Sequence, residues 1–336
     1  MHSTENNPDT ASLHRYRESL PFYRQAEFWK KTGIFWALIL LIIIMAISQP
    51  AFLTKPNLIN ILKQASITGI LAVGMTMVLI TGGIDLGVGS VLAVACMAAA
   101  YCTTADQSWP IGVAFLAGIT VGAIFGLFNG IGVAYVGFAP FIVTMATLSA
   151  ARGIALVSTN NRPIFNLSRE FINVSNTLYL GLPSLIYYFV GIAVIAYILT
   201  TKTVFGKWIY AVGGNETAAR LSGINVRVVK LIIYMIMGAL SGLTGVLMAS
   251  RITSGNPTVG SGYELDAIAA CVIGGISMSG GSGSIIGTVL GVLILGVISN
   301  GFDILGISSN YQMIMKGMVI LLAVFIDIRA RARKSV

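Results

Sequence analysis

The chain has 336 residues and a net charge of +9; 56% of its residues are hydrophobic and only 10% are charged. A typical soluble domain has about 25% charged residues. A membrane-spanning helix needs about 20 mostly apolar residues, so this chain can supply about nine or ten spans and little else. A soluble enzyme, a disordered tail protein and a nucleic-acid-binding protein are excluded as the main body of the molecule.

The hydropathy pattern predicts an all-α polytopic membrane protein with about ten transmembrane helices. A cytoplasmic N-terminal tail over 1–32 precedes a single transmembrane domain over 33–328, and a basic C-terminal tail over 329–336 follows. The predicted spans are 33–48, 58–81, 88–104, 110–136, 138–158, 183–201, 230–249, 265–277, 284–300 and 311–328.

Two polar stretches interrupt the apolar pattern. The stretch over 159–181 is expected to be solvated, and the stretch over 202–229 forms a cytoplasmic loop. Most of the 21 Lys and Arg residues fall in the tails and in the 202–229 loop. Because basic residues favour the cytoplasmic side, both termini are predicted to be cytoplasmic, which an even number of spans allows.

Glycine patterns suggest an internal duplication. Gly118, Gly122, Gly126 and Gly130 recur at every fourth residue, and a second ladder consists of Gly283, Gly287 and Gly291. An Asn-Gly pair ends each ladder region, at Asn129 and at Asn300. Five spans separate the copies, so spans 2–5 and 7–10 would form an inverted repeat, a common plan in transporters. The alternative is that glycine ladders only allow close helix packing, as they do in many membrane proteins.

The cytoplasmic loop contains a short helix signal. Asn215 is a good N-cap, Glu216 suits the positive first turn, and Gly223 ends the segment. A helix of about two turns is too short to be stable alone in water. It is either a coupling helix that seats in a groove of a separate ATPase, or an interfacial helix that caps the bundle.

Several motifs resemble the permease subunits of monosaccharide ABC importers, most closely those of the ribose type. They extend along nearly the whole chain after the N-tail and include residues 72–76 (AVGMT), 83–90 (GIDLGVGS), 213–225 (GGNETAARLSGIN), 262–270 (GYELDAIAA) and 311–314 (YQMI). The chain departs from the ribose type at Gly87, where members often have Ser, and in its longer N-tail.

The resemblance implies a type II-like ABC importer permease architecture, a homodimer with a central pathway, and a location in the bacterial inner membrane. It also implies a cytoplasmic ATPase partner, which binds ATP and Mg²⁺, and a periplasmic sugar-binding protein. The residues that the resemblance assigns to ATPase coupling are Gly213, Gly214, Asn215, Glu216, Ala218, Ala219, Arg220 and Gly223.

The chain offers no chemistry of its own. It contains no P-loop, since Gly206-Lys207 is followed by Trp208. His2 and His14 both lie in the N-tail, and the three cysteines form no CxxC pair. We therefore expect a transport subunit with no catalytic, cofactor or metal site.

Polar residues in apolar segments are the candidates for a pathway. Asp85 either lines a path or braces the glycine loop around it. The other candidate pathway residues are Asn129, Thr144, Thr147 and Asn300. Glu264 and Asp266 start the eighth span on the periplasmic side, where they stabilise the helix N-terminus or contact the binding protein. Arg152 and Lys316 lie within spans and either snorkel or pair with a carboxylate.

These observations favour a permease that translocates a monosaccharide, ribose-like, delivered by a periplasmic binding protein and driven by a separate ATPase. One alternative is a stand-alone secondary transporter or channel with Asp85 as its ion site. Another is a related ABC permease for branched-chain amino acids or an autoinducer sugar.

Overall fold

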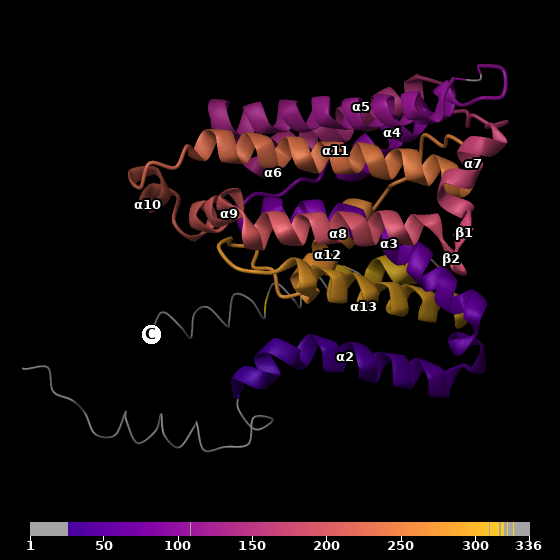
Figure 1. Cartoon of the computed structure of the whole chain (residues 1–336), viewed down its shortest axis with the longest axis horizontal. Coiled ribbons are helices and arrows are strands. Elements are labelled where there is room, and N and C mark those ends of the chain that lie inside the picture. Colours follow the sequence, from indigo (N-terminus) through magenta and orange to yellow (C-terminus); the bar gives the residue numbers. More distant parts are fainter. Residues whose placement is uncertain are drawn as a thin grey trace, which may run out of the picture.

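The computed structural model describes residues 26–107, 109–308, 310–315, 317, 318, 321 and 325, with side chains from residue 33 onward. Long helices run along one axis of a bundle, with α9 and α10 at one end and α7, β1 and β2 at the other (Figure 1). The helices are α2 Ala26–Ser48, η2 Pro50–Leu53, α3 Lys55–Ile80, α4 Val88–Cys102, α5 Ile111–Ile131, η3 Gly132–Val136, α6 Pro140–Val157, α7 Arg169–Asn176, α8 Ser184–Lys202, α9 Val204–Gly214, α10 Glu216–Leu221, α11 Val226–Ile252, α12 Tyr263–Ile273 and α13 Ile285–Ile304. The two strands, β1 Leu178–Tyr179 and β2 Leu182–Pro183, form one small antiparallel hairpin.

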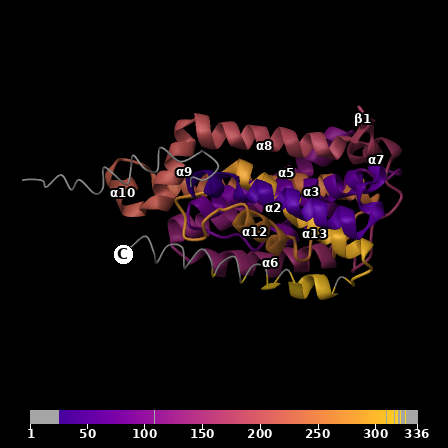
Figure 2. The same ribbon diagram turned by 90° about the horizontal axis from the view of Figure 1, so that it is seen from below.

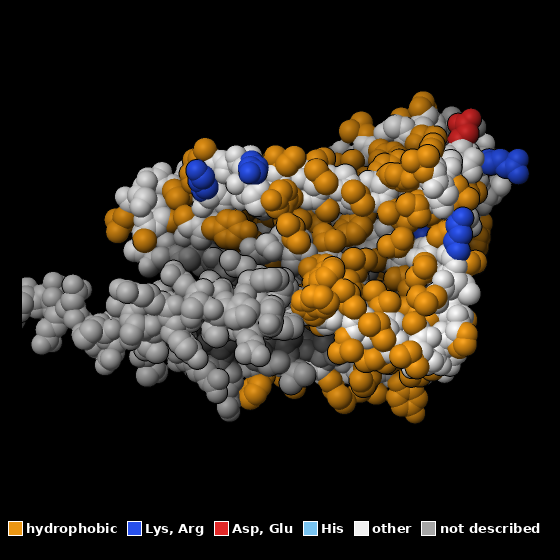
Figure 3. Space-filling model, turned by 60° about the horizontal axis from the view of Figure 1, so that its bottom comes forward, with side chains coloured by type: hydrophobic (Ala, Val, Ile, Leu, Met, Phe, Trp, Pro, Cys, Tyr) orange, Lys and Arg blue, Asp and Glu red, His pale blue; other side chains and the backbone are white. Residues whose placement is uncertain are grey.

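The predicted all-α class is confirmed. Six helices are long and apolar enough to cross a membrane: α3, α5 continued by η3, α6, α8, α11 and α13. Exposed apolar side chains cover the middle of one face, and the visible Lys, Arg, Asp and Glu lie toward its two ends (Figure 3). This distribution suits a molecule surrounded by lipid along its length.

Three predicted spans are shorter helices in the structure. They are residues 33–48 within α2, α4 and α12. The 15 residues of α4 extend only about 22 Å, less than the bilayer core of about 30 Å. A non-helical loop over 81–87 precedes α4, and its Thr81, Asp85 and Leu86 are buried in protein. Irregular backbone at membrane depth is tolerated only where protein or a polar cavity surrounds it.

The predicted tails fall largely outside the described residues. Helix α2 begins at Ala26, so the first helix starts seven residues earlier than the predicted boundary at residue 33. The tail over 329–336 lies outside the described residues, and the tenth predicted span is described only at scattered positions.

Helix α3 lies at the centre of the bundle. From Ala65 to Ile80 every residue except Thr68 is buried. Helix α3 packs against α11, α12 and α13, whereas α11 packs against α3, α4 and α5. The first helix of each proposed half therefore contacts the second and third helices of the other half, and α11 begins 171 residues after α3 (226 against 55). This exchange supports the inverted repeat, which stays a prediction.

The two glycine ladders, which the sequence analysis treated as copies in a duplication, are not equivalent; their second members, Gly122 and Gly287, lie 165 residues apart. A Cβ on Gly122 would overlap the backbone of Gly238 and Gly242 in α11, in the other half. A Cβ on Gly287 would overlap Gly274, which follows α12 of the same half. Asn129 and Asn300 are 171 residues apart, so these asparagines keep the register of the helices and the ladders do not.

The polar stretch over 159–181 is only partly solvated. Ser168 caps α7 by accepting a 3.3 Å hydrogen bond from the N–H of Phe171, whose side chain is fully buried. The hydroxyl of Ser175 donates to the carbonyl of Leu247, and its N–H donates to Ser250 Oγ. The expectation of a solvated loop was wrong for α7. One face of this helix is buried: Phe171 packs there as an apolar side chain, and the polar groups of Ser175 form hydrogen bonds with α11.

Candidate functional site

Helix α9 crosses the end of the bundle at a steep angle to α8 (Figure 2). Thr203 caps it, accepting a 3.1 Å hydrogen bond from the N–H of Gly206. The sequence analysis did not predict α9, because it treated the polar stretch over 202–229 as a loop with only one short helix. In the structure Gly206 lies against the carbonyl of Thr200. Gly213 lies against the carbonyl of Ile80, where any side chain would collide. These glycines therefore allow close packing of α9 onto the end of α3.

Helix α10 follows at once and confirms the predicted short helix. Asn215 Oδ1 accepts a 2.9 Å hydrogen bond from the N–H of Ala218, and Gly223, at φ +84°, ends the segment. Ala219 faces inward and is buried, whereas Leu221 is 85% exposed. The helix projects beyond the bundle (Figure 1). It exposes the apolar side chain of Leu221 and the charged pair of Glu216 and Arg220.

Glu216 joins α10 to the transmembrane helices. Its Oε2 lies 2.6 Å from Lys230 Nζ in α11, and its Oε1 lies 3.0 Å from Arg220. The hydrogen bond from Lys230 is the main reason that the pKa of Glu216 lies below its usual value. A displacement of α10 would therefore act on the first turns of α11.

A hollow of about 760 Å³ lies beside this junction. Its walls are η3 with the loop that follows it, the α9–α10 junction and the start of α11. Arg227, Lys230 and Glu216 give it a charged wall. The short helix therefore stands beside an open, charged recess.

Three of the five predicted pathway residues form one buried cluster. Asp85 accepts hydrogen bonds from the N–H of Gly87 at 2.9 Å and from Asn129 Nδ2 at 3.3 Å. The hydroxyl of Thr147 donates to Asn129 Oδ1. All three side chains are buried, so the cluster ties the 81–87 loop to α5 and α6.

The other predicted polar residues lie elsewhere. Thr144 donates to the carbonyl of Pro140 in its own helix. Asn300 exchanges two hydrogen bonds, of 2.8 and 2.9 Å, with Asn57 of α3. Arg152 donates to the carbonyls of Pro257 and Val259 instead of snorkelling. Lys316 lies outside the described residues.

The two acidic residues of α12 have different surroundings. Glu264 accepts a 3.3 Å hydrogen bond from the N–H of Gly262 in the turn that begins the helix. Asp266 lines a cavity between helices. Both lie in the first turn of α12, and Glu264 lies against Gly89 at the start of α4.

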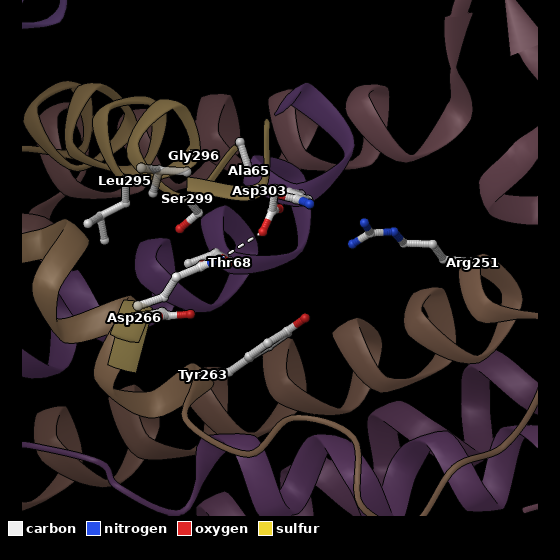
Figure 4. A pocket seen from close by; sticks show the side chains of 12 residues that line it. Ala65, Thr68, Arg251, Tyr263, Asp266, Leu295, Gly296, Ser299 and Asp303 are labelled. Carbon is white, nitrogen blue, oxygen red and sulfur yellow. Dashed lines mark hydrogen bonds between the residues drawn. The ribbon is translucent and has the colours of Figure 1, made fainter. Parts of the chain in front are cut away.

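This cavity has a volume of about 220 Å³ and is polar (Figure 4). The guanidinium of Arg251, the hydroxyl of Tyr263 and the carboxylate of Asp303 point toward the same space (Figure 4). The sequence analysis predicted only Asp266 among its residues. The lining polar residues are Gln64, Thr68, Arg251, Tyr263, Asp266, Ser299, Asp303 and Gln312. The available signal was four-residue spacing within apolar helices, as in Gln64 with Thr68 and Ser299 with Asp303.

A bundle of spanning helices, a polar cavity between them and a short charged helix at one end define a membrane transport component. The chain matches, over residues 57–324, the family described as branched-chain amino acid transport system / permease component, and it belongs to that family. It is thus a polytopic transport subunit and not an enzyme, and the predicted resemblance is confirmed.

Several curated proteins are similar over nearly their whole length. The ribose import permease protein RbsC of Bacillus subtilis (strain 168) is 45% identical over 300 residues, covering 89% of this chain and 92% of that protein. The D-allose transport system permease protein AlsC of Escherichia coli (strain K12) is 37% identical, covering 92% and 95%. The galactose/methyl galactoside import permease protein MglC of Haemophilus influenzae is 37% identical, covering 91% and 96%. No solved structure matches the chain.

Proposed function

We propose that this protein is the permease subunit of an ATP-driven importer and that its cargo is a monosaccharide, ribose-like. The relatives named for ribose, allose and galactose support a sugar cargo. The family description names branched-chain amino acids, whereas these relatives, which match about nine tenths of the chain, are named for sugars. The cargo is a neutral polyol, which needs hydrogen-bond partners and no net charge.

The arrangement of α10 carries the proposed mechanism. Helix α10 projects beyond the bundle while Glu216 ties it to Lys230 of α11, and α9 packs on the end of α3. Force applied to α10 by a separate ATPase would therefore reach α3 and α11, the central helices of the two halves. ATP and Mg²⁺ belong to that ATPase, and this chain contributes the helix that receives the force.

The same proposal includes the partners of the chain and its orientation in the membrane. Two copies form the membrane unit in a bacterial inner membrane, with both tails and α10 in the cytoplasm. A periplasmic sugar-binding protein docks at the opposite end, where Glu264 and Asp266 begin α12. A stand-alone secondary transporter or channel is not favoured, because the relatives that match along the chain are named as import or transport-system permeases.

Charge reversal tests the coupling role. Glu216→Lys opposes Lys230 and Arg220, and Arg220→Glu opposes Glu216. Each variant of the full chain is expected to lose co-purification with the partner ATPase and to lose uptake of labelled ribose in cells. Glu170→Lys and Arg169→Glu are matched controls, because both residues are exposed in α7 at the opposite end.

Two results would contradict the proposal. Undiminished association and uptake in both α10 variants would remove the coupling role from this helix. Sugar accumulation by the isolated chain in liposomes, driven by an ion gradient and without ATPase, would establish a secondary transporter instead.

A further inference from the structure

We propose that the 220 Å³ cavity between α3, α11, α12 and α13 is a monosaccharide-binding site that lies inside a single protomer. This inference rests on the proposed function and adds to it the residues that hold the cargo. It also places one sugar-binding site of the translocation path within one chain and not at the contact between two chains.

The first argument is hydrogen bonding. Within the described part of the chain, the side chains of Gln64, Thr68 and Ser299 make no hydrogen bond, although all three line the cavity. All three residues are half-buried, and a polar group in such a place needs a hydrogen-bond partner from the protein, water or a ligand. Water or a polar ligand in the cavity must therefore satisfy them.

The polar residues predicted from sequence show the contrast. Asp85, Asn129 and Thr147 satisfy one another, and Asn300 is satisfied by Asn57. None of these four side chains lines the cavity. Polar groups that are paired hold the fold together, whereas polar groups that are unpaired and face a hollow are available to a ligand.

The second argument is the mixture of donors and acceptors. Arg251 supplies only donors, and the carboxylates of Asp266 and Asp303 supply acceptors. Gln312 donates a 2.9 Å hydrogen bond to Asp303 Oδ1, which orients that carboxylate (Figure 4). Each hydroxyl of a sugar both donates and accepts, so a polyol matches this lining better than a simple cation or anion.

The third argument is size and position. A volume of 220 Å³ corresponds to about seven water molecules at about 30 Å³ each, which suits one sugar ring better than a disaccharide. The cavity lies near the end of α11 and the beginning of α12, opposite α10. In the proposed orientation it is the first polar recess that a sugar meets after release from the binding protein.

Thiol labelling tests the site without requiring transport. Thr68→Cys places a reactive group in the cavity, while the native Cys96 and Cys271 are fully buried and Cys102 is 7% exposed. The full chain in lipid nanodiscs is labelled with a small methanethiosulfonate reagent while D-ribose, D-xylose or D-galactose is titrated. At about ten times the dissociation constant, bound sugar is expected to slow labelling about tenfold.

Matched variants locate the effect. Thr258→Cys lies on an exposed loop and is expected to be labelled equally with and without sugar. Adding Gln64→Leu to Thr68→Cys should abolish protection, whereas adding Gln107→Leu, at an exposed position outside the cavity, should leave it intact.

Several outcomes would overturn the site. Protection by none of the three sugars, protection by sucrose, or protection by L-valine in place of sugars would each contradict it. Ribose uptake by the intact importer is measured in parallel. ATP-driven uptake without protection would overturn the cavity and leave the proposed function standing, whereas loss of ATP-driven uptake in the wild type would overturn the proposed function.

Discussion

Glu216 Oε2 accepts a 2.6 Å hydrogen bond from Lys230 Nζ, fourteen residues further along the chain. The Lys230 side chain is 20% exposed and the Glu216 side chain 42% exposed, so the pair lies at the edge of the protein. This contact joins a helix that is too short to be stable alone to the long helix α11. In the proposed mechanism, force on α10 reaches α11 through this contact.

The two partners of Glu216 are expected to contribute unequally. Lys230→Met should loosen α10 by about 0.5–1 kcal/mol, because that pair is the better shielded one, whereas Arg220→Met at 64% exposure should have almost no effect. Hydrogen exchange of the α10 amides measures the difference, expected to be about two- to fivefold faster in Lys230→Met. Equal exchange rates in the two variants would show that Lys230 does not anchor the helix.

The contact also predicts a pH dependence. The pKa of Glu216 is lowered from 4.5, so the stabilisation is present above about pH 4.5 and is lost as pH falls through the lower pKa of the folded state. After correction for the intrinsic rate, exchange of the α10 amides should be constant from about pH 5.5 to 8 and rise below about 4.5. Glu216→Gln should remove this rise, and a rise centred near neutral pH would implicate another group.

The contact between α5 and α11 predicts a steep cost at Gly122. A Cβ there would overlap the backbone of Gly238, which cannot move aside as a flexible side chain can. Gly122→Ala should therefore destabilise the protein by about 1–3 kcal/mol and lower its Tm in detergent. Gly153→Ala in α6 is the matched control, because no atom lies within 4 Å of that Cβ. Equal Tm values for the two variants would contradict close backbone packing.

The Asn57–Asn300 pair predicts non-additive effects. Asn300→Leu leaves the amide of Asn57 without this partner, at a cost of about 1–3 kcal/mol. Asn57→Leu leaves Asn300, which is 1% exposed, unpaired in the same way. The double variant should be less destabilised than the sum of the single variants, because no amide remains unpaired. Thermal unfolding of the four proteins measures the coupling, and additive losses would show that the pair does not form.

A variant of Asp85 distinguishes the two roles proposed for it, which are bracing the 81–87 loop and lining the pathway. Asp85→Ala leaves the N–H of Gly87 and the amide of Asn129 without their acceptor, so a loss of about 2 kcal/mol is expected. If Asp85 braces the loop, uptake should fall in proportion to folded protein with an unchanged KM for ribose. Asp106→Ala, in an exposed turn, is the control. A raised KM at unchanged folded yield would assign Asp85 to the pathway instead.

Local sequence patterns predicted a helix correctly where residues within that helix alone determine where it begins and ends. The Asn215 cap and the Gly223 stop predicted α10, because capping depends on residues within one turn. Helix α9 was missed because the whole stretch over 202–229 was predicted to be a loop, whereas α9 is placed by contacts such as that of Gly213 with Ile80, far away in sequence. The glycine ladders were aligned wrongly for the same reason, since each ladder faces a different neighbouring helix.

Hydropathy, positive charge and capping were enough to predict a helical membrane protein, because they act through neighbouring residues and the surrounding lipid, whereas the permease assignment came from the resemblance of its motifs to a family. Only the tertiary structure decided which polar residues pair and which face a cavity. Gln64, Arg251, Tyr263 and Ser299 come from four helices. Whether a buried polar group has a partner is a property of packing in three dimensions, and spacing along one helix does not contain it.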